Sequence, residues 1–425
     1  MAKQKEVQIL VYADWVGLGG PQLLGVLSTQ RLRGKELFAF EYDNAWLKSQ
    51  NVQLLDPDLQ LYGGKQYLND SGKTNFGLFL DSSPDRFGRV LMRRREAALA
   101  RSEERTEQPL FVTDYLLGVY DGHRMGALRF KINDDGPFLD DRVDMATPPW
   151  SSIRTLEQAS LKLEEENVVD DPEYLRWLNM LMAPGSSLGG ARPKASVLDP
   201  DGQLWIAKFP SKNDKDDVGA WEKVTHVLAV QAGIDIADAK AQVFSNKSHT
   251  FLTKRFDRTD NGGRIHFASA MTLLGYTDGA DHSEGASYLE LADFITNQGA
   301  QPTSDLKQLW RRIVFHICVS NTDDHLRNHG FLLTPKGWKL SPAYDINPNE
   351  TGTGLTLNIN EHENALDINL AMEASPYFRL SEKEALSIVT EVKSATANWH
   401  LAAEKLGSAK AQRMLKVRAF EHGLT

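Results

Sequence analysis

Short strand-like runs, broken by turn residues, mark the first part of the chain and predict β-strands. Two such runs occupy Val7–Ala13 and Glu36–Tyr42, and a third is Met125–Lys131. Successive side chains of a strand point to opposite faces, so each run can cover a core with one face. A helix is predicted over Arg86–Arg101, and its arginines are interpreted as a solvated face, with an anion site as the alternative.

The middle of the chain alternates helical and strand-like segments. Residues 199–202 read Asp-Pro-Asp-Gly and predict a tight turn between two strands. Asp217 is suited to cap a following helix, and Gly233 is suited to end it. The predicted helices are Ile153–Glu166, Tyr174–Met182 and Val218–Ala232, and the predicted strands are Ala195–Leu198, Gln203–Phe209 and Phe251–Phe256.

Helical periodicity prevails after residue 257. Apolar residues recur three and four positions apart between Leu306 and Ile317, which is the spacing of one helix face. Ser381 and Glu384 have the pattern of a capping box before another helix. We therefore expect a first half rich in strands and a second half that is mainly helical.

Composition narrows the class of protein. A chain of 425 residues is too long for one ordinary core, so two or three domains are expected. With 41% hydrophobic and 25% charged residues, the chain has the composition of a globular protein. It contains no apolar run of about 18 residues and no export signal. The single cysteine, Cys318, permits no intrachain disulfide, and we expect a reducing cytoplasm as the compartment.

The net charge of −9 argues against a surface that binds nucleic acid as a whole, although it leaves room for a local basic patch. Function must therefore be sought in particular groups of residues.

The most informative group lies around a predicted hairpin in the second half. Two short strands, residues 330–334 and 338–342, flank a Pro-Lys-Gly turn. Asn328 comes just before the first strand, and Asp345 follows the second. Because a hairpin brings its two ends together, an amide oxygen and a carboxylate should meet there. These hard oxygen ligands suit Mg²⁺ bound with phosphates.

Asp323 precedes Asn328 by five positions. This is the spacing of a protein-kinase catalytic loop, in which the aspartate accepts the proton of the substrate hydroxyl and the asparagine holds metal. Asp324 misses that spacing by one residue and is assigned a secondary role. Taken alone, the Asp-Asp-His sequence is equally typical of a surface turn, and His325 of a packed histidine.

A second group lies in the strand-rich half. Ser187–Lys194 is a loop with two glycines and a lysine, which would let backbone amides approach phosphate, although an ordinary loop is the alternative. Lys208 lies among apolar residues of the following strand and either binds nucleotide phosphates or reaches solvent. Glu222 on the next helix is its candidate partner. Asp257 is placed to reach a ribose after a hinge strand, with an ion pair to Arg255 or Arg258 as the alternative.

Several motifs together resemble those of the HipA family of kinases, the toxins of bacterial type II toxin–antitoxin pairs. They are Leu-Thr-Lys-Arg-Phe-Asp-Arg at residues 252–258, Asn-Thr-Asp-Asp-His-Leu-Arg-Asn at 321–328, Leu-Ser-Pro-Ala-Tyr-Asp at 340–345, the loop at 187–194, and residues 78–89. The resemblance covers nearly the whole chain. It implies an α+β, two-lobed protein-kinase-like fold with an added β-rich N-terminal subdomain and a helical C-lobe. The expected domains are residues 1–110, 111–256 and 257–425.

The resemblance also implies residue roles. Asp323 would be the catalytic base, Asn328 and Asp345 the Mg²⁺ ligands, and Glu222 the helix partner of the nucleotide lysine. In this family a serine at the start of the phosphate loop is autophosphorylated, which here is Ser187, with Ser186 as the alternative. ATP would contact Leu188, Gly189, Gly190, Ala191, Arg192, Lys194, Lys208, Lys254, Phe256, Asp257 and His325.

The function implied is a serine/threonine protein kinase that uses ATP and Mg²⁺. The family phosphorylates aminoacyl-tRNA synthetases and binds a small DNA-binding antitoxin of the HipB type, so contact with DNA would be indirect and contact with a membrane is not expected. Two alternatives remain: an ATP-dependent kinase of small molecules, and a non-catalytic kinase-like co-repressor. Labelled phosphate transfer would distinguish them.

Overall fold

The computed structural model describes residues 6–32, 34–68, 72–142, 146–182 and 192–423. The chain divides into two compact units, and each is described separately here. The first unit comprises residues 1–213 and 257–268, and the second comprises residues 214–256 and 269–425. The three domains expected from the sequence have other boundaries and stay a prediction.

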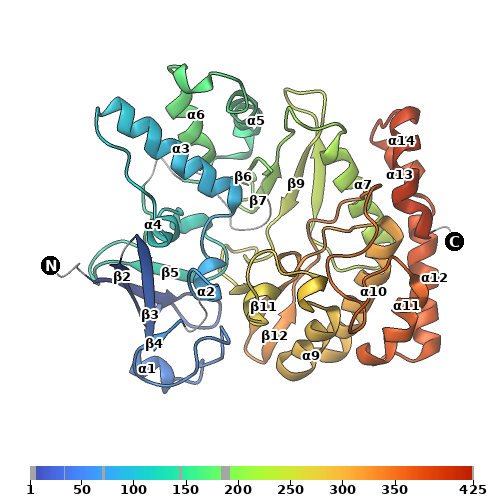
Figure 1. Ribbon diagram of the computed structural model, residues 1–425, viewed down its shortest axis with the longest axis horizontal. Helices are drawn as coiled ribbons and strands as arrows, with labels where there is room; N and C mark the ends of the chain where they lie inside the picture. Colours follow the sequence, from blue (N-terminus) through green and yellow to red (C-terminus); the bar gives the residue numbers. More distant parts are fainter. Residues whose placement is uncertain (1–5, 33, 69–71, 143–145, 183–191, 424–425) are drawn as a thin grey trace. The chain divides into compact units, whose positions relative to one another are not determined.

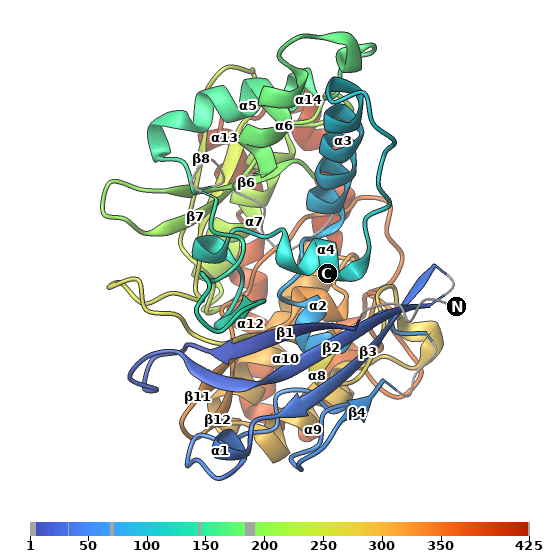
Figure 2. The same cartoon turned by 90° about the vertical axis from the view of Figure 1, so that its left-hand side faces the viewer.

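A five-stranded antiparallel sheet forms one part of the first unit, with the strand order β4-β3-β2-β1-β5 (Figure 2). The strand predicted over Val7–Ala13 is present as β1, and Ile9, Val11 and Ala13 on one of its faces are fully buried. The strands are β1 (Val7–Ala13), β2 (Gln22–Leu32), β3 (Lys35–Tyr42), β4 (Gln66–Tyr67) and β5 (Leu128–Lys131).

The strand predicted from Met125 begins only at Leu128. Gly126 has a φ of +70°, in the left-handed region that favours glycine. Its N–H donates a hydrogen bond to Asp257 Oδ2 at 2.8 Å instead of entering a β-ladder. The apolar pattern alone could not reveal this turn of the backbone.

Helices form the rest of the first unit, together with the hairpin of β6 (Lys194–Leu198) and β7 (Leu204–Lys208). The longest helix, α3, packs against α6, which in turn packs against α5 (Figures 1 and 2). Helix α5 ends four residues before the predicted end. The helices are α1 (Asn44–Leu47), α2 (Gly77–Leu80), α3 (Arg86–Ser102), α4 (Val112–Leu117), α5 (Ile153–Lys162) and α6 (Tyr174–Met182).

The second unit is built around α10 (Pro302–Val319), which contacts α9, α11 and α12 (Figure 1). Leu306, Leu309 and Trp310 of this helix are fully buried, as the periodicity predicts. The other helices are α7 (Val218–Gln231), α8 (Ala270–Leu273), α9 (Tyr288–Gln298), α11 (Ile368–Ala374), α12 (Glu382–Thr396), α13 (Trp399–Lys405) and α14 (Lys410–Lys416).

Two hairpins complete the second unit. Strands β8 (Ala239–Gln242) and β9 (Thr250–Lys254) pair antiparallel, and so do β11 (Gly330–Thr334) and β12 (Gly337–Leu340). Strand β10 (Phe267–Ser269) lies where the chain passes from the first unit to the second.

The helix caps show how closely local sequence sets these elements. Ser381 and Glu384 form the predicted capping box of α12, and the Asp217 side chain caps α7 by accepting from Ala220 N. In the described part of the chain, no helix has the length and apolar character needed to cross a membrane.

Candidate active site

The predicted hairpin is confirmed, and it brings the segment after β12 beside the loop before β11. In the hairpin, Phe331 pairs with Leu340 and Thr334 with Gly337. Beyond it, Asn347 N donates to Asn321 Oδ1 at 3.1 Å. These bonds hold residues 344–349 alongside residues 320–328, which carry the candidate base and amide. The hairpin therefore does what the sequence predicted, in joining two distant polar segments.

Asn328 is oriented so that its amide oxygen remains available. The side chain is 5% exposed, and its Nδ2 donates to the carbonyl oxygen of Asp323 at 2.8 Å. Among the described residues, no donor reaches its buried Oδ1. An unsatisfied buried oxygen costs about 1–3 kcal/mol, so its presence requires an explanation. An oxygen held ready for a hard cation explains it.

Asp345 is held in an uncommon backbone conformation. Its φ is +57°, and its Oδ1 accepts a hydrogen bond from Asn347 Nδ2 at 3.3 Å. For a residue other than glycine, a left-handed conformation costs on the order of 1–3 kcal/mol and persists where the surroundings enforce it. Such residues gather at functional sites, which agrees with the role predicted for this carboxylate.

The environment of Asp323 raises the pKa of its carboxyl. The side chain as a whole is exposed, but nearby protein atoms partly desolvate the carboxyl, and this is the largest cause of the increase. The charges of Asp345 and Asp324 raise the pKa further, whereas His325 lowers it. Because two carboxylates act on it electrostatically, Asp323 belongs to the same cluster of charges as the candidate metal ligand.

Asp324 faces away from that cluster, into the core. The residue is 2% exposed, and its Oδ2 accepts hydrogen bonds from His316 Nδ1 at 2.7 Å and from His329 Nε2 at 2.8 Å. The hydroxyl of Tyr288 donates to the same oxygen. Burial opposes ionisation, but the two imidazoles outweigh it and hold the pKa of Asp324 well below its usual range. Asp324 is therefore a buried anion that anchors the loop between Asp323 and Asn328.

The sequence interpretation missed the partners of Asp324. His316 and His329 are both buried, and Tyr288 is fully enclosed at the start of α9. A signal was present, since His316 interrupts an otherwise apolar stretch from Ile313 to Val319. A polar side chain on a buried helix face needs a partner, but the sequence does not say which one.

A family comparison now agrees with this geometry. Residues 186–399 match the family model described as the HipA-like C-terminal domain. The chain belongs to the HipA family. The match includes the loop with Asp323 and Asn328, the hairpin, and Asp345.

Relatives of known name support the assignment. A Haemophilus influenzae protein described as a candidate kinase is 26% identical over 180 residues, covering 38% of this chain and 52% of that protein. The serine/threonine-protein kinase toxin HipA of Shewanella oneidensis is 24% identical over 143 residues, covering 29% of this chain and 33% of that protein. The chain thus spans about a third to a half of the length of these curated relatives.

A solved structure extends the likeness to the fold of nearly the whole chain. HipA from the complex of the Shewanella oneidensis toxin–antitoxin proteins HipA and HipB with operator DNA has a TM-score of 0.65, with 98% of this chain and 96% of that chain covered. The sequence identity is 16%. The α+β, kinase-like fold expected from the sequence is therefore confirmed.

The phosphate loop of the HipA family falls mostly outside the described residues. Ser186, Ser187 and residues 188–191 belong to that part, so their roles stay predictions. Lys194, at the end of the loop, is described and 3% exposed. Its Nζ forms an ion pair with Asp85 Oδ2 at 2.7 Å. This buried pair ties the amine to the cap of α3, so a direct contact of Lys194 with phosphate stays a prediction.

The other proposed nucleotide residues come from several elements. Lys208 is buried in β7, and Glu222 is buried in α7. Their pairing stays a prediction. The Phe256 ring lies 5.5 Å from the Tyr344 ring, one residue before Asp345. The contacts of ATP with Phe256, Arg192, Lys254 and His325 likewise stay predictions.

Asp257 shows the ion pair that the sequence left open as an alternative. Its carboxylate is fully buried, and its Oδ2 lies 2.7 Å from Arg258 Nη1. The same oxygen accepts the hydrogen bond of Gly126 N. This arrangement favours a structural role within the first unit, and a contact of Asp257 with ribose stays a prediction.

The donor set fits a metal that arrives with its nucleotide. Within the described ranges, no three histidine, cysteine or acidic side chains gather into a metal-binding group. Mg²⁺ in phosphoryl-transfer sites needs fewer protein ligands, because phosphates and water complete its shell. Asn328 Oδ1 and the carboxylate of Asp345 are the ligands that this structure offers.

Proposed function

We propose that this chain is a serine/threonine protein kinase of the HipA type, which transfers the γ-phosphoryl group of Mg-ATP to a protein hydroxyl. The observation that carries the proposal is the buried, unsatisfied Oδ1 of Asn328, whose Nδ2 is bonded to the backbone of Asp323. One residue thus links the candidate metal site to the candidate base. The kinase names of the relatives support the same activity.

In the proposed reaction, Asp323 orients the substrate hydroxyl and takes its proton. The hydroxyl oxygen forms a bond to the γ-phosphorus, and the bond from that phosphorus to the β-phosphate oxygen breaks, which leaves ADP. When bound, Mg²⁺ would neutralise the charge on the phosphates. Asn328 and Asp345 would hold it, and the raised pKa of Asp323 makes this carboxylate a better proton acceptor.

Regulation and partners follow the family pattern in this proposal. Autophosphorylation of Ser187, or of Ser186, would add about −1.5 to −2 charges to the phosphate loop and oppose ATP binding. The likeness to HipA from a complex with HipB and DNA supports a HipB-type antitoxin as partner. An aminoacyl-tRNA synthetase is the proposed class of substrate, which would make the chain a toxin that acts on translation.

The test is transfer of labelled phosphate from ATP to the proteins of a whole lysate. The parent chain should label one or a few proteins, and Asp323→Asn should lower the rate by roughly 10²–10⁴-fold. Asp201→Asn is the matched control, since Asp201 is an exposed turn residue, and it should leave transfer unchanged. Label that appears only in small molecules would contradict a protein kinase, and no transfer at all would contradict a kinase of any kind.

A further inference from the structure

Helix α3 carries a row of arginines that the proposed activity does not use. Arg86, Arg93, Arg94 and Arg101 are all exposed. At about 100° per residue, these positions fall within roughly 100° of the helix circumference, so they form one stripe. None of the four has a carboxylate partner among the described residues, and Arg94 donates only to the carbonyl oxygen of Leu163, at 3.1 Å. The chain as a whole is acidic, with a net charge of −9.

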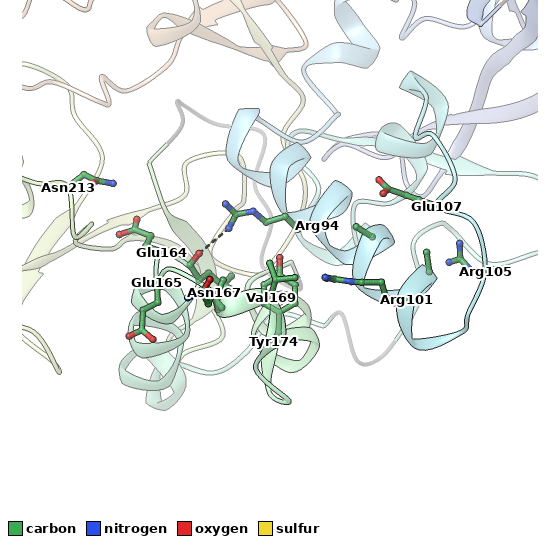
Figure 3. A pocket seen from close by; sticks show the side chains of 14 residues that line it. Arg94, Arg101, Arg105, Glu107, Glu164, Glu165, Asn167, Val169, Tyr174 and Asn213 are labelled. Atoms are coloured by element: carbon green, nitrogen blue, oxygen red, sulfur yellow. Dashed lines mark hydrogen bonds between the residues drawn. The ribbon is translucent and has the colours of Figure 1, made fainter.

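The stripe runs into a groove of about 850 Å³ within the first unit. Figure 3 shows Arg94 and Arg101 on the α3 side of this groove, with Arg101 pointing toward Val169 and Tyr174 and Arg94 toward the carbonyl oxygen of Leu163. Apolar side chains of α3 and of the segment between α5 and α6 supply part of its surface, including Ala97, Ala100, Leu163 and Val168, and charged and amide side chains supply the remainder. Val169 is 42% exposed, which is a large fraction for an aliphatic residue.

Of the three acidic residues that line the groove, only Glu165 is paired with cations in the part of the chain that the structure describes. Glu165 forms ion pairs with Lys162 and Lys212. Glu164 accepts hydrogen bonds from the hydroxyl of Ser211 at 3.1 Å and from the backbone N–H of Lys212 at 2.6 Å. Glu107, also in the lining, has no partner among the described residues.

One of the three cations of the groove is also paired: Arg105 forms ion pairs with Glu96 and Glu103, which lie outside the lining. Arg94 and Arg101 form no ion pair with the residues that the structure describes, although Glu107 and Glu164 line the same groove. Their charges therefore remain available to a ligand, and the adjoining arginines of the stripe extend the positive potential.

We propose that this groove and the α3 stripe bind an acidic segment of a protein partner, with carboxylates at Arg94 and Arg101 and an aliphatic side chain against the exposed Val169. A nucleic acid fits less well, because its continuous row of phosphates would face Glu107, Glu164 and Glu165. A nucleic acid also lacks aliphatic side chains for the apolar wall. The proposal is independent of phosphoryl transfer, since it uses none of the residues assigned to that reaction.

The test uses the full chain and a fluorescein-labelled peptide of repeated Glu-Glu-Leu units, with binding followed by anisotropy. A peptide of Gln-Gln-Leu units and a single-stranded oligonucleotide are the comparison probes. The acidic peptide should bind best, and its affinity should fall as salt is added. Arg101→Glu should weaken binding by about threefold or more, and Arg94→Glu with Arg101→Glu by about tenfold or more.

Two further variants keep the test decisive. Arg154→Glu is the matched charge reversal, at an exposed arginine of α5 outside the groove, and it should change the affinity by less than about twofold. Val169→Glu places a negative charge on an exposed position of the apolar wall. It should weaken the binding of the acidic peptide while the protein stays folded. Equal binding to the parent and the double variant would overturn the proposal. So would tighter binding of the oligonucleotide, or no saturable binding of the acidic peptide up to roughly 0.1 mM protein.

Discussion

The role of Asp324 as a buried anchor can be tested by a change of one atom. Asp324→Asn keeps the shape of the side chain and removes its charge. In the native protein, one carboxylate oxygen accepts from Tyr288, His316 and His329. The amide oxygen of asparagine can take the same position and still accept, but it is uncharged, so each of the three hydrogen bonds is weaker. We therefore expect a weaker network.

The expected loss of unfolding free energy in Asp324→Asn follows from the number and kind of hydrogen bonds that the carboxylate accepts. A hydrogen bond to a charged group contributes about 1.5–3 kcal/mol, and three such bonds meet on Asp324. If the amide keeps about half of that energy, the loss is roughly 2–4 kcal/mol. Breaking a buried charged pair typically costs about 3–5 kcal/mol, which is consistent. Against a total stability of about 5–15 kcal/mol, this is a large change.

Scanning calorimetry of the parent and the variant measures the effect, because it separates transitions if the two units unfold separately. At about 2–4 °C per kcal/mol, the midpoint of the second unit should fall by roughly 4–16 °C. Asp323→Asn, at the exposed neighbouring aspartate, is the control and should stay within about 1–2 °C of the parent.

The rate of phosphoryl transfer should rank the two variants in the opposite order from their thermal stability. Below its unfolding temperature, Asp324→Asn should retain far more phosphoryl transfer than Asp323→Asn. A double-mutant cycle adds a sharper readout, because Tyr288→Phe should cost less in the Asp324→Asn background than alone. A midpoint of Asp324→Asn within about 1 °C of the parent would refute the reasoning. If Asp324→Asn lost all transfer while Asp323→Asn kept it, the base would be Asp324 instead.

Three other predictions follow from the same geometry. Asp345→Asn should lower Mg²⁺-dependent ATP affinity, measured by calorimetry, as well as the rate, whereas Asp323→Asn should lower the rate alone. The pKa of the Asp323 carboxyl is raised, and this group must be ionised to accept a proton. The rate of phosphoryl transfer should therefore fall as the pH decreases through that raised pKa, which lies above the pKa of an ordinary aspartate. A transfer rate that stays constant down to about pH 4 would contradict this prediction. Lys194→Met should destabilise the first unit by about 3–5 kcal/mol, because it removes the cation that pairs with the buried carboxylate of Asp85. Adding Asp85→Asn should recover part of that loss, as thermal unfolding would measure.

The sequence by itself determined most local structure and the identity of the candidate site. Hydrophobic periodicity located α6 and α10, and the capping box at Ser381 located the start of α12. Such features are local, since a cap or a helix face depends on residues a few positions apart. The hairpin around Gly337 was equally readable, and it made the approach of the segment with Asp345 to the loop with Asp323 and Asn328 predictable.

Only the tertiary structure decided what distant residues do to one another. The ion pair of Lys194 with Asp85 joins residues that are far apart along the chain. The ion pair of Asp257 with Arg258 joins neighbours, and it depends on the direction in which the Asp257 side chain points. The different surroundings of Asp323 and Asp324 are the clearest example of an effect that only the tertiary structure sets. The two aspartates are adjacent and chemically identical, yet Asp323 is exposed and Asp324 is buried among two histidines and a tyrosine. A sequence can state their spacing, but burial and the surrounding donors set their pKa values, and these come from the packing of α9 and α10 around the loop.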